Sequence, residues 1–495
     1  MLTGELRTLK TAFAILLAAC LPFASACSPR AESQPAPAAR VTVFEGARLI
    51  AGDGSAPIED SAFIVENNQF TYVGRRADVK VPAGATRVDL AGKTVMPTLV
   101  DLHGHVGFQN IAEGTMSKET YTRDNLIDHL ELLAYNGVGA VVGVGDLVSR
   151  SDLHGGRTNW GDVPLRVRDE VVPGAALFRT AGPGIAWPGS GAQGDPSRMD
   201  VSYPVSTEDE ARAAVRDYAA MKPTFIKIWV DDRGGTKKTL TPPLYRAVAD
   251  EAHKFNIPVG VHNVTLANAK ELMRAGVEGW LHVPVRGGEI ADEELVAIVK
   301  GRIARNDRPK MWMTPSLITQ WMNTQGGGTK PEWLDDPLLL AAYSTADVEQ
   351  HWGEPLRKMT ARDVAKARKS FESDARSAMT LRAAGMTIVN GTDTGQTRFW
   401  IGYFNHLDLE SMVAMGLTPS EAIVAATHDS AAVAQIDTGT VAAGKNADFI
   451  VLDANPLERI GNTRKINKVY LRGVEVDRAA LRARWQARRR PATTN

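Results

Sequence analysis

Cysteine is almost missing from this chain, and its scarcity restricts the chemistry that any site can use. The two cysteines among the 495 residues stand at positions 20 and 27, ahead of every segment with a folded pattern. No disulfide can therefore cross-link the folded part, and no thiolate in the folded part can bind a metal. Any metal site must draw on His, Asp, Glu or a modified side chain.

A net charge is missing as well. The chain has 57 Lys and Arg against 57 Asp and Glu. Nucleic-acid binding needs a broad basic field, and disordered solvating chains are usually acidic, so the sequence favours neither class. The balanced charge fits a small-molecule or dipeptide-like substrate. It is equally compatible with a homo-oligomer.

Long apolar runs are also missing, apart from one short run near the start. Arg7 and Lys10 precede the apolar residues 11–19, whereas a membrane-spanning helix needs about 20. The segment resembles a bacterial lipoprotein signal that is cleaved before Cys20. Cys27 is the alternative position: either Cys27 is lipidated in place of Cys20, or an ordinary signal peptidase cleaves there without lipidation. We expect an exported protein, periplasmic or attached to the membrane only through this lipid.

The pattern of strands, turns and helices predicts two folded parts. Residues 41–96 and 437–480 consist of short strands with turns, including Asn67-Asn68, which predicts one small β-sandwich domain built from both chain ends. Residues 97–436 alternate β-rich runs with helical patterns. The remaining predicted segments are the signal (1–27), a Pro/Ala-rich tether (28–40) and a basic C-terminal tail (481–495).

Eight β-rich runs in the middle part predict a (β/α)8 TIM barrel of the α/β class. They are 94–103, 138–146, 176–181, 225–230, 257–262, 277–282, 311–317 and 386–393. The helices between them have recognisable starts. Thr207 with Glu210, and Thr418 with Glu421, each have the spacing of a capping box.

Side chains that can bind a metal stand at the C-terminal ends of these runs, where barrel enzymes place their catalytic groups. His103 and His105 end the first run, and residues two apart in an extended segment point to the same side. His262, His282 and Asp393 end the fifth, sixth and eighth runs. One such histidine alone would indicate a capped or solvated residue. Four histidines and an aspartate at one rim predict a metal site.

Lys227 lies inside the fourth run and faces the barrel interior, because Ile226 and Ile228 face the other side. A buried ammonium is costly unless it is paired or neutralised. Two explanations stay open. Lys227 reaches the rim and pairs with Asp231, Asp232 or the substrate, or CO2 carboxylates it and the carbamate bridges two divalent metals. We favour the carbamate, because it supplies the anion that two cations in a four-histidine pocket require.

This order of residues resembles the metal-dependent amidohydrolase superfamily. Within it the chain is most similar to the imidazolonepropionase-like and prolidase-like (Xaa-Pro dipeptidase-type) branch. Further segments that carry the resemblance are 93–97, 100–103, 226–228, 391–393, 416–422 and 444–453. The chain departs from the family pattern at Thr98 and Gly104, and no Glu stands at the third position after His262. The last departure argues against deamination of purines or pyrimidines.

The resemblance implies hydrolysis of a C–N bond, amide or peptide, in a substrate such as a dipeptide or an N-acyl amino acid. Two divalent metals, with zinc the first expectation, would activate a bridging hydroxide for the attack. Asp393 would act as general base and then general acid, and His282 is assigned with it to the catalytic group. The implied ligands are His103, His105, Lys227 (carboxylated), His262, His282 and Asp393. The alternatives are a cyclic-amide hydrolase with a mononuclear site and a non-catalytic binding lipoprotein.

Substrate selection is expected in the long loops. The insertion 318–357, with Trp321, Trp333 and Trp352, suits either a lid over the substrate or surface loops anchored by tryptophans. Residues 147–204 offer Arg150, Arg157 and Arg198 as carboxylate partners. His406 is a candidate substrate contact, with an exposed helix position as the alternative. The other histidines are expected to be structural or solvated: His129, His154, His253, His351 and His428.

Overall fold

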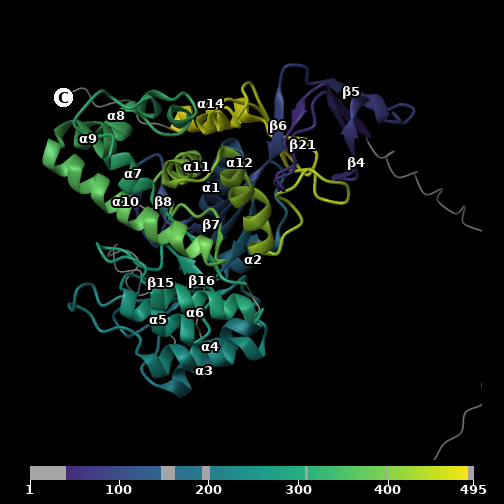
Figure 1. Cartoon of the computed structure of the whole chain (residues 1–495). Helices are drawn as coiled ribbons and strands as arrows, with labels where there is room; N and C mark the ends of the chain where they lie inside the picture. The colour runs from purple at the N-terminus through teal and green to yellow at the C-terminus, as the bar shows by residue number, and fades with distance from the viewer. Residues whose placement is uncertain (1–40, 147–161, 192–200, 307–309, 396–398, 489–495) are drawn as a thin grey trace, which may run out of the picture. The chain divides into compact units, whose positions relative to one another are not determined.

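Parallel strands and the helices between them make up the larger part of the molecule (Figure 1). The computed structural model describes residues 41–146, 162–191, 201–306, 310–395 and 399–488. All of these fall within one compact unit of the chain. The predicted signal and tether lie outside the described residues. Among those described, no helix combines the length and apolar character that crossing a bilayer requires.

The parallel strands form two sheets. The first has the order β11-β10-β7, with β7 (Leu99–Gly104), β10 (Val138–Gly143) and β11 (Leu177–Thr180). The second has the order β13-β12-β14-β15-β16-β17-β18, with β12 (Ile185–Ala186), β13 (Tyr203–Pro204), β14 (Ile226–Val230), β15 (Val259–Asn263), β16 (Gly279–Leu281), β17 (Trp312–Thr314) and β18 (Thr387–Ile388). Each predicted run contains a strand, and β12 and β13 are additional.

Backbone contacts join the two sheets at both edges. Gly104 at the end of β7 forms an isolated parallel bridge with Thr394, just beyond β18. At the other edge of the first sheet, the Thr224 N–H ahead of β14 donates a 2.9 Å hydrogen bond to the Thr180 carbonyl of β11. The arrangement is an α/β fold of the TIM-barrel type. The described strands do not, however, form the single closed eight-stranded sheet that was predicted, because only such isolated contacts cross the edges.

Helices connect the parallel strands, and α3, α4, α5 and α6 pack against one another in succession (Figure 1). Both predicted capping boxes are formed, at Thr207 before α3 and at Thr418 before α12. The longer helices are α1 (Arg123–Tyr135), α3 (Glu208–Met221), α4 (Pro242–Lys254), α5 (Leu266–Arg274), α6 (Glu293–Ala304), α10 (Ala361–Ala383), α11 (Tyr403–Met415) and α14 (Arg478–Arg488).

Short elements fill the connections. The short α-helices are α2 (Val163–Asp169), α7 (Ile318–Asn323), α8 (Thr345–Val348), α9 (Glu354–Lys358), α12 (Pro419–Val424) and α13 (Ser430–Ala434). The 3-10 turns are η1 (Arg76–Asp78), η3 (Glu332–Asp335), η4 (Leu339–Ala341) and η7 (Ile460–Arg464), and the π-helical turns are η5 (Glu349–Gly353) and η6 (Ala425–Asp429). A small hairpin joins β8 (Gln109–Asn110) and β9 (Thr115–Met116).

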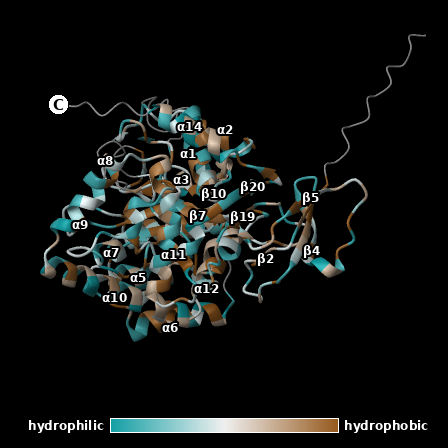
Figure 2. Cartoon of the chain, turned by 90° about the horizontal axis from the view of Figure 1, so that it is seen from above, coloured by the Kyte–Doolittle hydropathy of each residue, from teal (hydrophilic) through white to brown (hydrophobic). Residues whose placement is uncertain are grey.

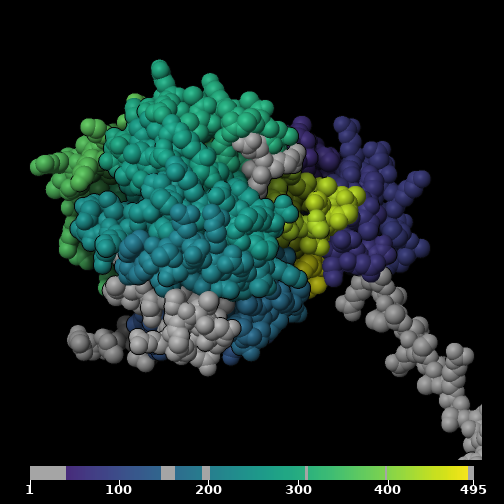
Figure 3. Space-filling model, turned by 90° about the horizontal axis from the view of Figure 1, so that it is seen from below, coloured from purple at the N-terminus to yellow at the C-terminus, as the bar shows by residue number. Residues whose placement is uncertain are grey.

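Two further sheets come from the beginning and the end of the described chain. One has the order β4-β3-β1-β5, with β1 (Thr42–Glu45), β3 (Ser61–Glu66), β4 (Gln69–Arg75) and β5 (Thr86–Asp89). The other has the order β2-β6-β19-β20-β21, with β2 (Arg48–Leu49), β6 (Thr94–Pro97), β19 (Phe449–Leu452), β20 (Ile466–Leu471) and β21 (Val474–Glu475). Because β6 pairs with β19, segments far apart in the sequence lie side by side (Figure 3).

A cluster of buried aromatic side chains joins these two end sheets. Phe44 stacks on Phe63 with ring centroids 4.9 Å apart, and Phe449 stacks on Tyr470 at 4.5 Å. Phe44 also meets Phe449 edge-on at 5.1 Å, so the two stacked pairs contact each other. Both ends of the chain therefore share one hydrophobic cluster. The predicted turn at Asn67-Asn68 is confirmed, since both residues have positive φ angles of 51° and 68°.

The main hydrophobic core lies around the parallel strands. Every residue of β7 and of β10 is buried, and Figure 2 shows hydrophobic colouring concentrated there. The core extends to the end of the described chain. Leu481 and Trp485 of α14 are buried, and Trp485 packs edge-on against Tyr135 of α1 at 5.3 Å. The first residues of the predicted basic tail thus form a packed helix, with apolar residues four apart facing the core.

Candidate metal centre

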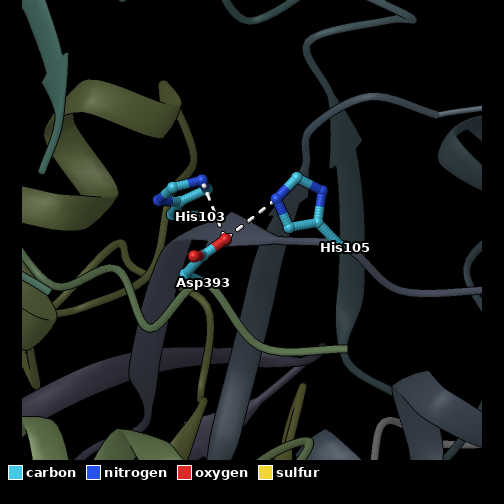
Figure 4. A group of neighbouring side chains, drawn as sticks. All are labelled: His103, His105 and Asp393. Atoms are coloured by element: carbon cyan, nitrogen blue, oxygen red, sulfur yellow. Dashed lines mark ion pairs between the residues drawn. The ribbon is translucent and has the colours of Figure 1, made fainter. Parts of the chain in front are cut away.

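Three predicted ligands meet at the carboxyl ends of β7 and β18. The Asp393 Oδ1 atom lies 2.9 Å from Nε2 of His105 and 3.4 Å from Nε2 of His103 (Figure 4). One potential ligand atom from each of the three residues lies within 4.8 Å of the others. The H-x-H spacing achieves this because β7 remains extended to Gly104, so both rings project toward the same point.

A buried aspartate connects the two strands that carry these groups. One oxygen of Asp101 accepts the His103 N–H at 3.0 Å, and the other accepts the Thr392 hydroxyl at 2.6 Å. Asp101 thus ties the strand that carries His103 to the loop that carries Asp393. Asp393 itself has a positive φ of 57°, which is uncommon for a residue other than glycine. Such backbone strain is held by surrounding contacts and is concentrated at functional sites.

The remaining two histidines extend the cluster across the second sheet. The ring centroid of His282 lies 5.0 Å from that of His103 and 5.1 Å from that of His262. His282 also has a positive φ, 109°, and its N–H donates to the Thr314 carbonyl of β17 at 3.0 Å. The four histidine rings therefore form one continuous row from β7 to β15.

The hydrogen bonds of these rings leave nitrogen atoms available for a metal. His105 Nδ1 lies 2.5 Å from the Val144 carbonyl, and since a carbonyl only accepts, this nitrogen carries the proton and Nε2 keeps its lone pair. His262 Nε2 bonds to Asp231 Oδ2 at 3.0 Å, which leaves Nδ1. Metal-binding histidines characteristically donate their second nitrogen to such a partner. No pattern in the sequence indicates that Asp231 orients His262.

Two further ring nitrogens are available to bind a metal. Nδ1 of His103 and Nδ1 of His282 are buried, and neither finds a hydrogen-bond partner among the described residues. A buried polar atom without a partner is costly, and native proteins rarely leave one unless a water, an ion or a ligand completes it. Nitrogen and carboxylate donors in this number are the ligand set of zinc or a similar divalent ion. The residues therefore fit a metal centre.

The protonation states of the donors also suit a metal. Burial lowers the pKa of His103 and His282 well below that of a free imidazole, and it lowers the pKa of His262 to about 3. These rings are neutral near pH 7, as metal ligation requires. Burial raises the pKa of the Asp393 carboxyl, but His103 and His105 outweigh burial and hold that pKa well below its usual range.

Lys227 occupies the inward position that the sequence predicted. Its side chain is 1% exposed and lies near the Trp229 ring, with Nζ 5.2 Å from the ring centroid. Burial lowers the pKa of this amine well below its usual value, although Asp393 opposes the effect. Neither of the predicted carboxylate partners pairs with it, since Asp231 bonds instead to His262. The described contacts thus do not support the paired-ammonium explanation.

His406 does not lie in this cluster. Its Nδ1 bonds to the Thr463 hydroxyl at 3.0 Å and its Nε2 to the Asn136 carbonyl at 2.9 Å, in a fully buried position on α11. Both ring nitrogens are therefore occupied by structural contacts, and none is left for the predicted contact with a substrate. The sequence Phe404-Asn405-His406 on a helix gives no sign that the ring of His406 will be buried.

Other predictions about histidines and loops have mixed outcomes. His129 is structural, because it accepts the Gly107 N–H at 2.8 Å beneath the loop that follows His105. Trp333 and Trp352 are buried against Trp400, with centroids 6.2 and 6.5 Å away, which favours anchored loops over a lid. Four predicted residues lie outside the described part of the chain: Arg150, His154, Arg157 and Arg198.

The comparisons with known proteins agree with this geometry. The model of the amidohydrolase family matches residues 94–476. The ochratoxinase of Aspergillus niger is 25% identical over 458 residues, which cover 85% of this chain and 83% of that protein. An imidazolonepropionase of Streptomyces avermitilis is 23% identical over 416 residues, covering 81% and 83%.

Solved structures show the same fold. A putative prolidase from Bifidobacterium longum has a TM-score of 0.66 at 22% identity and covers 91% of this chain and 100% of that one. A Xaa-Pro dipeptidase with methionine in its active site has a TM-score of 0.64 at 20% identity, covering 88% and 99%. The chain belongs to the amidohydrolase family. It is a hydrolase that acts on carbon–nitrogen bonds.

Proposed function

We propose that this protein hydrolyses the amide or peptide bond of a small substrate, such as a dipeptide or an N-acyl amino acid, with the help of two divalent metals. The observation that carries the proposal is the continuous row of four histidine rings that ends on the Asp393 carboxylate. Relatives named as prolidase and ochratoxinase support an amide bond as the target, and an imidazolonepropionase keeps a cyclic amide as the alternative.

The residues present divide into two ligand sets. His103, His105 and Asp393 would hold one ion, and His262 and His282 would hold the other. Lys227 would supply a further anionic ligand as a carbamate, because its depressed pKa leaves the neutral amine that CO2 requires. Ions in these positions would polarise the scissile carbonyl and supply an activated water.

Asp393 is the group that would move the proton. Its Oδ1 faces the imidazoles of His103 and His105, and its low pKa keeps it ionised and ready to accept a proton from the attacking water. After the tetrahedral carbon forms, the same oxygen would return the proton to the leaving nitrogen. His282, which is assigned with Asp393 to the catalytic group, would act through the ion that it and His262 would hold.

The proposal also covers how the sheets combine into domains. The two parallel sheets would together make up the (β/α)8 barrel, and the two end sheets would make up a small β-sandwich around the Phe44–Phe449 contact. An N-terminal lipid on Cys20 or Cys27 would keep the enzyme outside the cytoplasm.

A hydrolysis panel tests the function. The mature protein, reconstituted with zinc, is assayed on dipeptides, N-acyl amino acids and one cyclic amide, before and after removal of metal with a chelator. We expect cleavage of linear amides that disappears with the metal and returns when zinc is restored. Cleavage of the cyclic amide alone would favour the imidazolonepropionase-like alternative. No hydrolysis by the zinc-loaded protein would refute the proposal.

A further inference from the structure

The loop that carries Asp393 lies directly on the backbone of His105. The His105 N–H donates a 2.7 Å hydrogen bond to the carbonyl of Thr394, the residue after Asp393. The side chains of His105 and Asp393 meet on the same side of this contact, as Figure 4 shows. One backbone hydrogen bond therefore joins the two chain segments that supply these ligands.

The close approach continues at Gly395, where no side chain has room. A Cβ atom at this position would lie 2.2 Å from the His105 carbonyl oxygen and 2.6 Å from the carbonyl carbon. Both are backbone atoms, so they cannot rotate aside as the end of a flexible side chain would. Gly395 also has a φ of 88°, which residues with a side chain rarely adopt. Glycine is therefore required here both by the contact and by the backbone conformation.

A second connection holds the same loop on the other side of Asp393. The Thr392 hydroxyl donates to Asp101 at 2.6 Å and accepts the Thr394 N–H at 3.2 Å. Asp101 belongs to β7, the strand that leads to His105. The loop is thus attached to this strand on both sides of Asp393, and neither attachment uses the Asp393 carboxylate itself.

We propose that Gly395 is a positioning residue of the metal centre. Because it has no side chain, the Asp393 loop rests on the His105 backbone, and this contact sets the 2.9 Å spacing between the Asp393 carboxylate and the His105 imidazole. The inference rests on the proposed function, since it concerns the ion that His103, His105 and Asp393 would hold.

The displacement that a side chain would cause can be bounded from the structure. Carbon atoms in ordinary contact stand about 3.5 Å from their neighbours, so a methyl group at position 395 would force the loop and the His105 backbone apart by about 1 Å. A misplacement of this size in a catalytic site costs about 100-fold in rate. Loss of an orienting contact weakens metal binding by about 10- to 100-fold.

Zinc titration of the metal-free protein tests the assignment without any turnover. Competition with a chromophoric chelator measures the affinity of each ion in wild type and in Gly395→Ala. We expect one ion to bind about 10- to 100-fold more weakly in Gly395→Ala and the other to bind as in wild type. With the zinc-loaded protein, kcat should fall about 100-fold.

Gly444→Ala is the matched control. Gly444 has a φ of 85°, but apart from its chain neighbours no heavy atom of the described residues lies within 4 Å of the position that a Cβ would take. Alanine at this position therefore meets the same backbone strain without the close contact. It should leave both zinc affinities and kcat unchanged, whereas equal losses in the two glycine variants would overturn the assignment.

Thr392→Val is a second perturbation of the same contact that adds no bulk. It removes the hydroxyl that connects Asp101 with the Thr394 N–H. We expect weaker binding of the same ion, by about 10-fold. This variant carries the test if Gly395→Ala does not fold, and wild-type affinity for both ions in Thr392→Val would overturn the proposal.

A double-mutant cycle with Asp393→Asn separates positioning from a general structural role. If Gly395 acts through the Asp393 carboxylate, Gly395→Ala should change zinc affinity little once that carboxylate is gone. An equal loss of affinity in both backgrounds would mean that Gly395 supports the fold and does not position the ligand.

The same measurements distinguish this inference from the proposed function. The predicted affinity pattern in a protein that hydrolyses no amide would support the role of Gly395 and refute the function alone. Amide hydrolysis by a Gly395→Ala variant with wild-type zinc affinities and kcat would overturn the inference and leave the function standing.

Discussion

Replacement of Asp393 by Asn would remove the proton carrier and keep the shape of the site. The amide occupies the same volume as the carboxylate, but it has no charge and cannot accept a proton near neutral pH. Positioned acid–base catalysis is typically worth about 100- to 10,000-fold, so we expect kcat to fall at least about 1,000-fold. That loss corresponds to about 4 kcal/mol of transition-state free energy.

Metal retention distinguishes this role from a purely structural one. Asp393 is one of several donors, and His103, His262 and His282 remain neutral without it, because burial lowers their pKa. We therefore expect the variant to keep at least about half of its metal. The assay pairs kcat at saturating zinc with metal content by mass spectrometry.

The control for this variant is Asp429→Asn, which breaks a 2.8 Å contact with His428 in η6, outside the row of histidines. It should leave kcat and metal content unchanged. Normal turnover in Asp393→Asn would remove Asp393 from the mechanism. Loss of all metal together with activity would show that the carboxylate acts mainly as a ligand.

Three further predictions follow from single contacts. Asp231→Asn should weaken metal binding or turnover by about 10- to 100-fold, because Asp231 orients the ring of His262. Trp485→Ala should lower the free energy of unfolding by about 3 to 5 kcal/mol, because the side chain is 3% exposed. The hydrogen bond to Glu278 raises the pKa of His253, so this pair adds stability that is fully present below pH of about 6.5 and is lost as pH rises through the raised value. The stability difference between wild type and His253→Gln should therefore shrink on going from mildly acidic to alkaline pH.

Each of these predictions has its own check. Unchanged zinc affinity and turnover in Asp231→Asn would mean that the His262 ring is held by other contacts. Val474→Ala, at a position 59% exposed, is the control for Trp485→Ala and should change stability little. Chemical denaturation across the pH range gives the His253 result, and a difference that does not vary with pH would rule out the charged pair.

The strand ends could be predicted from sequence because they depend on local patterns. An apolar run that ends in His or Asp indicates both a buried strand and the rim on which the side chain emerges, and this located His103, His262, His282 and Asp393. The capping boxes at Thr207 and Thr418 were predictable for the same reason, since each depends on only four residues.

What the sequence could not show depends on contacts between distant segments. Asp231 was considered as a partner for Lys227, but the structure turns it toward His262, which lies 31 residues later. His406 is held by hydrogen bonds to Asn136 and Thr463, which are far from each other in the sequence.

The metal content of the purified mature protein tests the central claim most directly. After equilibration with zinc and removal of the excess, we expect about two divalent ions per chain. The His262→Ala variant should retain roughly half of that metal content. A protein that binds no divalent metal under these conditions would contradict the assignment of the histidine row as a metal centre.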